Sequence, residues 1–122
     1  MQHKNIPNKD RLIFAMDVPD CERARSLADE LGDAITFYKI GLELMMSGEY
    51  FELLDWMLER DKKVFCDLKF FDIPATVGSA VRQLKDRGAS FVTVHGNRSI
   101  MESYRRAFAR STTNPWATRN AL

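Results

Sequence analysis

Hydrophobic and polar residues alternate along the chain in two kinds of segment. Short apolar runs that end in a polar residue are typical of buried strands, and four occur, at residues 12–17, 35–39, 64–69 and 91–95. The segments between these runs carry apolar residues at three- and four-residue spacing, which indicates amphipathic helices. This alternation predicts an α/β protein built from βα units around a parallel sheet.

Four helices are expected between and after the strands, at about residues 20–31, 48–60, 74–87 and 99–110. Asp20 is suited to cap the first helix, and Gly32 is suited to end it. Pro74 falls in the first turn of the third helix, and Gly88 follows its last residue. In the second helix, Phe51, Leu54 and Leu58 are spaced three and four apart, which predicts that they share the inward face.

Residues 1–110 are therefore expected to form four βα units with parallel strands, and residues 111–122 a loose C-terminal segment without hydrophobic period. A complete (β/α)8 barrel takes about 250 residues, so four units correspond to the N-terminal half of a TIM barrel. An open four-stranded sheet with helices on both faces would show the same alternation.

Composition excludes several classes of function. The 122 residues contain 18 Lys and Arg against 17 Asp and Glu, so no concentrated positive charge favours nucleic acid. No apolar run approaches the length of a membrane span, and the first residues lack the apolar core of a secretory signal, which favours a cytoplasmic location. Cys21 and Cys66 stand outside any CxxC pair, so we expect buried thiols without a disulfide rather than metal ligands.

Each expected strand carries an ionisable side chain at its C-terminal end. Residues two apart share one face of a strand, so these side chains are expected on the same side of the sheet. The C-terminal ends of the strands are where βα folds place catalytic groups. In chain order the side chains are Asp17, Lys39, Asp67, Lys69 and His95. Any one of them could simply mark where a strand meets solvent, but the set together favours a site.

The third strand carries the densest cluster of charges. Asp67 and Lys69 point the same way on an otherwise apolar strand, and Asp72 and Ile73 complete the pattern D-x-K-x-x-D-I. Removing such charges from water is costly unless they are partnered or used. A lysine between two carboxylates stays protonated, so Lys69 suits the role of a proton donor better than that of an amine nucleophile.

At these residues the chain resembles the orotidine 5′-phosphate decarboxylase family. The resemblance covers about residues 10–102, and its most specific part is the run Asp-Leu-Lys-Phe-Phe-Asp-Ile-Pro-Ala-Thr-Val at residues 67–77. Supporting segments lie at residues 14–18, 38–41 and 93–96. Related sugar-phosphate decarboxylases and hexulose-phosphate synthases share the bare D-x-K-x-x-D. The Ile-Pro that follows Asp72, together with Tyr-Lys-Ile-Gly at residues 38–41, favours the orotidylate branch.

The resemblance implies roles for four charged residues. Lys69 would protonate C6 of the pyrimidine as carbon dioxide leaves, and Asp67 would lie beside the substrate carboxylate. Asp17 would bind the ribose hydroxyls with Lys39, which also links to the carboxylates. The resemblance implies no metal and no organic cofactor, and the sequence shows no ligand cluster with suitable spacing.

The resemblance also implies a homodimer with shared active sites. Asp72, Ile73 and Thr76 would reach across the interface into the site of the partner subunit. His95 is a further candidate for contact with the substrate, although a packing or hydrogen-bonding role is favoured for a histidine at a strand end.

The function implied by the resemblance is decarboxylation of orotidine 5′-phosphate to UMP in de novo pyrimidine biosynthesis. Family members continue through four more strands, whose loops hold the phosphate and the pyrimidine, so a truncated or frame-shifted chain is our hypothesis. Similarity is expected to stop at about Ser103. Two alternatives stay open: an Mg²⁺-dependent sugar-phosphate decarboxylase or hexulose-phosphate synthase of the same superfamily, and an inactive half-barrel remnant or interaction module.

Overall fold

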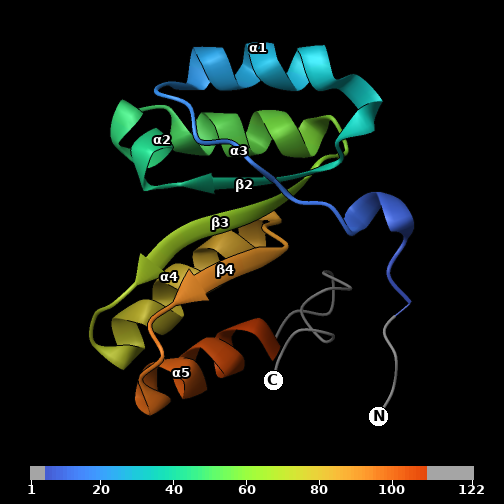
Figure 1. Ribbon diagram of the computed structural model, residues 1–122. Helices are drawn as coiled ribbons and strands as arrows, with labels where there is room; N and C mark the ends of the chain where they lie inside the picture. Colours follow the sequence, from blue (N-terminus) through green and yellow to red (C-terminus); the bar gives the residue numbers. More distant parts are fainter. Residues whose placement is uncertain (1–4, 110–122) are drawn as a thin grey trace. The chain divides into compact units, whose positions relative to one another are not determined.

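A computed structural model describes residues 5–109 of the chain and shows strands alternating with helices (Figure 1). The strands are β1 (Phe14–Ala15), β2 (Phe37–Gly41), β3 (Lys63–Phe70) and β4 (Phe91–Val94). The helices are α1 (Cys21–Leu31), α2 (Leu42–Ser47), α3 (Tyr50–Glu59), α4 (Pro74–Arg87) and α5 (Arg98–Ala109), with short 3₁₀ turns at Asn8–Asp10 and Gly32–Ala34. The strand order is β1-β2-β3-β4. The predicted order of four βα units is confirmed, and the segment expected to be loose, residues 111–122, lies outside the described residues.

The chain forms two compact units, Met1–Phe65 and Cys66–Leu122, and the boundary falls inside β3. In the first unit, β1 pairs with β2 in parallel, with Ala15 opposite Lys39. The predicted first strand is too long, because Leu12 lies outside the ladder and its side chain is 60% exposed. At the start of β3, the Lys63 N–H donates to the Thr36 carbonyl oxygen at 2.8 Å.

Local sequence signals fix the ends of α1. The Asp20 side chain accepts a hydrogen bond from the Arg23 N–H at 2.8 Å, which caps the first turn. The helix ends at Gly32, whose φ of 51° lies in the left-handed region that favours glycine. Cys21 and Cys66 are both buried, as expected.

The helix predicted at about residues 48–60 corresponds to α3 within two residues at each end, but its predicted face is wrong at Phe51. A further helix, α2, precedes α3 and was not predicted; Gly48, with a left-handed φ of 108°, separates the two. Phe51 is 39% exposed rather than inward-facing. The buried face of α3 is turned by one residue and consists of Tyr50, Leu53, Leu54 and Met57.

Buried ionic and hydrogen-bonding groups tie the first unit together. The Lys63 ammonium donates to the carboxylate of Asp10, which is only 5% exposed. The Lys62 ammonium donates to the carbonyl oxygens of Gly32 and Ile35, at 2.7 and 2.9 Å. The two lysines thus provide hydrogen bonds to the buried Asp10 carboxylate and to two carbonyl oxygens of the turn between α1 and β2. Buried polar groups require such partners.

In the second unit, α4 and α5 lie side by side (Figure 1). The predicted bounds of α4 are confirmed, with Pro74 in its first turn and Gly88 after its end at a φ of 111°. The Lys85 ammonium is buried and donates to the Ala107 carbonyl oxygen at 3.0 Å. This carbonyl lies in the last turn of α5, and the C-terminus of a helix attracts a positive charge. None of the helices within the described residues combines the length and hydropathy that a membrane crossing requires.

Gly78 allows the close approach of α4 and α5. It is buried, and a Cβ atom placed on it would overlap the Ser103 hydroxyl oxygen. That hydroxyl donates to the Pro74 carbonyl oxygen at 2.6 Å, and Ser103 is 8% exposed. Ser103 therefore cannot turn away from an added methyl group without burying an unpaired hydroxyl.

We expect Gly78→Ala to lower the free energy of unfolding by about 1 kcal/mol, because the overlap and the lost hydrogen bond outweigh the better helix propensity of alanine. Urea titration followed by circular dichroism measures the change. Gly96→Ala is the matched control, since a Cβ there meets nothing within 4 Å. The double variant Gly78→Ala/Ser103→Ala removes the overlap but also lacks the hydrogen bond to Pro74, so it should recover only part of the loss. An unchanged Gly78→Ala protein would contradict the packing described.

Two fully buried tyrosines differ in whether their hydroxyl groups are satisfied. The Tyr50 hydroxyl donates to the Ile40 carbonyl oxygen at 3.0 Å. The Tyr38 ring packs edge-on against Phe14, but its hydroxyl has no hydrogen-bond partner among residues 5–109. Burial raises the pKa of the Tyr38 phenol above its ordinary value of 10.0. The hydroxyl of Tyr38 therefore stays protonated and costs stability where that of Tyr50 contributes to it.

Tyr38→Phe and Tyr50→Phe should consequently change stability in opposite directions. Tyr38→Phe removes an unpaired buried hydroxyl, so we expect an unfolding free energy equal to the original or higher by up to about 1 kcal/mol. Tyr50→Phe breaks a buried hydrogen bond and should lose about 1 kcal/mol. Thermal melting of the two variants side by side provides the measurement. A loss of the same size in both would mean that Tyr38 has a partner.

Candidate functional site

Asp17 and Lys39 form a pair in the first unit. The parallel register sets Ala15 against Lys39, and the Met16 N–H donates to the Lys39 carbonyl oxygen at 2.9 Å. Asp17 therefore leaves the end of β1 beside Lys39, with 4.0 Å between its Oδ1 and the Lys39 Nζ. The Asp17 side chain is 66% exposed and that of Lys39 only 26% exposed. A pair with one partner this exposed adds little stability, and the Asp17 carboxylate is open to a ligand.

The second unit brings together Asp67 and Lys69, near the end of β3. The Lys69 Nζ donates to Asp67 Oδ2 at 2.9 Å, which confirms that the two side chains lie on the same side of the strand. The Asp67 side chain is only 10% exposed, whereas that of Lys69 is 63% exposed. A buried carboxylate thus holds an ammonium group that solvent, or a bound molecule, can reach.

The backbone at Lys69 is unusual. Its φ is 50°, in the left-handed region that is costly for a residue with a side chain. This turn directs the Lys69 N–H to the hydroxyl oxygen of Thr93 on β4, at 2.9 Å. The Thr93 hydroxyl in turn donates to Asp67 Oδ1 at 2.8 Å. The costly backbone conformation of Lys69 is therefore held in place by these two hydrogen bonds.

Asp72, Ile73 and Thr76 lie together in the loop before α4 and in the first turn of this helix. Asp72 Oδ1 accepts a hydrogen bond from the Ile73 N–H at 2.6 Å. All three residues are exposed, and Ile73 retains 70% of its accessible surface. The loop thus presents a carboxylate and an apolar side chain to the outside of the unit that carries Asp67.

His95 follows β4 directly. Its N–H donates to the Phe70 carbonyl oxygen at 2.9 Å, which continues the contact between β3 and β4. Its ring stacks on Phe71, with 4.3 Å between ring centroids and 29° between planes. The stacking is a packing contact of the His95 ring, whereas the hydrogen bond comes from its backbone. The side chain is exposed, and contact with a substrate stays a prediction.

Thr93 was not predicted as a site residue, although the sequence contained a signal for it. It shares its strand face with His95, two residues further on, and so points to the same side of β4. Threonine carries no charge, so a search for ionisable groups at strand ends passes over it. That the pair Asp17 and Lys39 shares one site with Asp67 and Lys69 stays a prediction.

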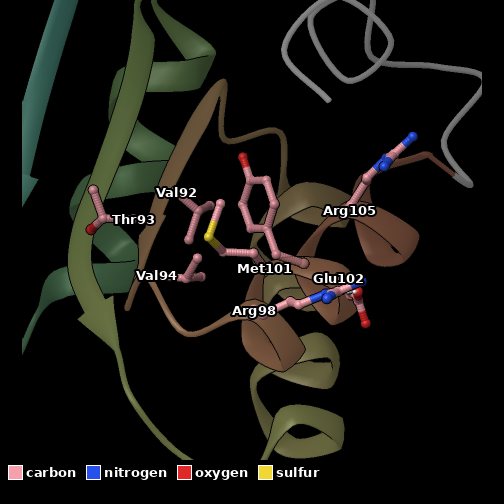
Figure 2. Close-up of a pocket in the computed structure, with 9 residues that line it drawn as sticks. Val92, Thr93, Val94, Arg98, Met101, Glu102 and Arg105 are labelled. Carbon is pink, nitrogen blue, oxygen red and sulfur yellow. Dashed lines mark hydrogen bonds and ion pairs between the residues drawn. The ribbon is translucent and has the colours of Figure 1, made fainter. Parts of the chain in front are cut away.

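A groove of about 610 Å³ lies between β4 and α5, and Thr93 is among the residues that line it. Figure 2 shows Val92 and Val94 pointing toward Met101, while Thr93 lies away from them. The groove is lined mainly by apolar atoms, and Asp67 and Lys69 do not line it. Within residues 5–109, no group of three or more His, Cys, Asp or Glu side chains is placed to hold a metal ion.

The sequence of the chain is similar to that of a known enzyme family. The model of the "Orotidine 5'-phosphate decarboxylase / HUMPS family" matches residues 10–115, which extends beyond the expected end of similarity near residue 103. Orotidine 5'-phosphate decarboxylase of Methylococcus capsulatus is 58% identical over 103 residues, 84% of this chain and 43% of the relative. The same enzyme of Stenotrophomonas maltophilia is 52% identical over 98 residues, 79% and 41% of the two chains.

Solved structures agree with the sequence comparison. The crystal structure of orotidine 5'-phosphate decarboxylase from Lactobacillus acidophilus superimposes with a TM-score of 0.71 at 30% identity, covering 80% of this chain and 45% of that one. The chain thus spans about two fifths of the curated relatives and about half of this solved structure. The prediction of an N-terminal half of a TIM barrel is confirmed.

Because the backbone at residue 69 is left-handed, two substitutions there can separate the effect of the backbone conformation on stability from the effect of losing the ammonium group. Lys69→Ala and Lys69→Gly both remove the ammonium group, but only glycine relieves the positive φ. We expect Lys69→Gly to be about 0.5–1 kcal/mol more stable than Lys69→Ala, because the left-handed cost exceeds the extra chain entropy of glycine. Chemical denaturation of both variants gives the difference. Equal stability would show that the backbone at residue 69 is not strained.

Proposed function

The chain belongs to the orotidine 5′-phosphate decarboxylase / HUMPS family, and on this premise we propose that it carries the proton-transfer residues for decarboxylating orotidine 5′-phosphate to UMP. The observation that carries the proposal is the buried Asp67 carboxylate holding the exposed Lys69 ammonium at 2.9 Å. The names of the curated relatives favour the orotidylate reaction over the sugar-phosphate reactions of the superfamily. Because the chain spans about two fifths of those relatives, the activity of the whole enzyme is a proposal here.

In the proposed reaction, Lys69 acts as the general acid. The bond between C6 and the carboxylate breaks, carbon dioxide leaves, and the electron pair stays on C6. The Lys69 ammonium then gives its proton to C6, and the resulting amine takes a proton from water. Asp67 holds the ammonium before the reaction begins, so the positive charge is already in place where negative charge develops. This step requires neither a metal nor an organic cofactor.

The remaining residues are proposed to bind the rest of the substrate. Asp17 accepts hydrogen bonds from the ribose hydroxyls, in agreement with its exposure, and Lys39 donates to them or to the carboxylates. His95 is proposed to contact the substrate at the edge of its stack with Phe71. Binding energy from parts of the substrate that do not react helps to hold the reacting carbon in position.

We further propose a homodimer with shared sites and a cytoplasmic location. Asp72, Ile73 and Thr76 would reach into the partner subunit's site, and their exposure supports this role. Ile73 and Phe71 together expose apolar surface of the kind that a second chain covers. Buried thiols without a disulfide suit a reducing compartment.

The decisive assay gives the purified chain orotidine 5′-phosphate in the presence of EDTA and follows the absorbance change on conversion to UMP. We expect turnover that EDTA leaves unchanged, and Lys69→Ala should lower kcat by at least about 100-fold because the proton donor is lost. Specific activity should also fall on dilution if two chains share each site.

Lys9→Ala is the matched control for the charge that Lys69→Ala removes. Lys9 is exposed, and its backbone carbonyl rather than its side chain bonds to Thr36. This variant should keep the original rate. A folded chain that gives no product at any concentration would overturn the proposal and favour the reading of an inactive half-barrel.

A further inference from the structure

The Thr93 hydroxyl bridges the backbone of Lys69 and the side chain of Asp67. The Lys69 N–H donates to Thr93 Oγ1 at 2.9 Å, and Thr93 Oγ1 donates to Asp67 Oδ1 at 2.8 Å. A backbone N–H can only donate, so the hydroxyl accepts there and its single hydrogen is left for the carboxylate. The chemistry of the three groups therefore fixes the direction of both hydrogen bonds.

These two bonds close a ring with the ion pair. Asp67 Oδ2 accepts from the Lys69 Nζ at 2.9 Å, so Thr93 and Lys69 occupy different oxygens of one carboxylate. The carboxylate cannot rotate about its bond to Cβ without breaking one of these contacts. The backbone of Lys69 is held in the same ring, at a φ of 50°. Thr93 thus restrains both ends of the residue that carries the proton.

We propose that Thr93 is a positioning residue, which orients the Asp67 carboxylate and the Lys69 backbone for proton transfer; this inference rests on the proposed function. Threonine is well suited to the role, since its branched Cβ restricts χ1 and keeps the hydroxyl pointing one way. It lies on β4, so it acts on the pair from the strand beside the one that carries them. Thr93 does not donate a proton to the substrate.

A positioning role has a kinetic signature that differs from a role in binding. The hydroxyl changes the orientation of a charged pair that acts in the transition state, and leaves the net charge of the site unaltered. Its loss should lower kcat, while KM is governed by substrate contacts elsewhere. A purely structural role would instead lower stability without this division between kcat and KM.

The first experiment compares Thr93→Val with Thr93→Ser in the decarboxylation assay. Valine keeps the shape of the side chain without the hydroxyl, so we expect kcat to fall about 10- to 100-fold, as for a lost hydrogen bond to a charged group. KM should stay within about twofold. Serine keeps the hydroxyl and should restore kcat to within about threefold of the original value.

The second measurement needs no enzyme activity. Hydrogen exchange of the Lys69 amide, followed by nuclear magnetic resonance, reports the bond from its N–H to Thr93 directly. We expect exchange to be at least about tenfold faster in Thr93→Val and near the original rate in Thr93→Ser. Thr36→Val is the matched control, because the Thr36 hydroxyl donates to the Lys9 carbonyl oxygen and lies 3.4 Å from Asp10 Oδ1, and neither contact involves Asp67 or Lys69. It should alter neither kcat nor the Lys69 exchange rate.

The outcomes separate this inference from the proposed function. Faster Lys69 exchange in Thr93→Val with a matching loss of kcat, both reversed by serine, supports the positioning role. Unchanged exchange, or an active Thr93→Val enzyme with its original kcat, overturns it. If the original chain shows no activity, the proposed function fails for this chain. The part of the inference that concerns catalysis then falls with it, even where exchange confirms the hydrogen bond.

Discussion

The carboxylate of Asp67 is the constraint on which the second unit depends. A charge that is nine-tenths buried must be partnered, and the chain provides partners from two strands: the Lys69 ammonium on β3 and the Thr93 hydroxyl on β4. In the same arrangement, Lys69 lies in the left-handed region and its N–H donates to Thr93. The geometry proposed for catalysis and the satisfaction of a buried charge are thus one arrangement.

In the same unit, the packing of α4 against α5 helps to position the loop that contains Asp72 and Ile73. Gly78 lets α5 come close enough for the Ser103 hydroxyl to reach the Pro74 carbonyl, at the first turn of α4. Asp72 and Ile73 precede that turn directly, so the position of the exposed loop depends on a buried contact further along the helix. Packing that appears purely structural therefore supports the residues proposed to meet a second chain.

Much of this could be predicted from the sequence, because strong local signals agreed with one another. Asp20, Gly32, Pro74 and Gly88 mark helix ends through backbone chemistry that needs no tertiary context. The alternation of side chains along a strand placed Asp67 and Lys69 on one face. The split at Gly48, the positive φ of Lys69 and the bond from Thr93 were not predicted. Each depends on contacts between elements distant in sequence, or on a glycine that can end a helix as well as sit within one.

One strand belongs to both compact units. The boundary between the units falls within β3, after Phe65, so its first residues are held by the Lys63 contacts to Thr36 and Asp10, and its last carry Asp67 and Lys69. Local opening of a protein proceeds in cooperative segments rather than residue by residue. A fluctuation that releases Lys63 therefore begins only four residues along the same backbone from Asp67. The Lys63–Asp10 pair and the Lys69–Asp67 pair thus hold the two ends of one strand, and the proposed site shares its backbone with contacts that lie outside it.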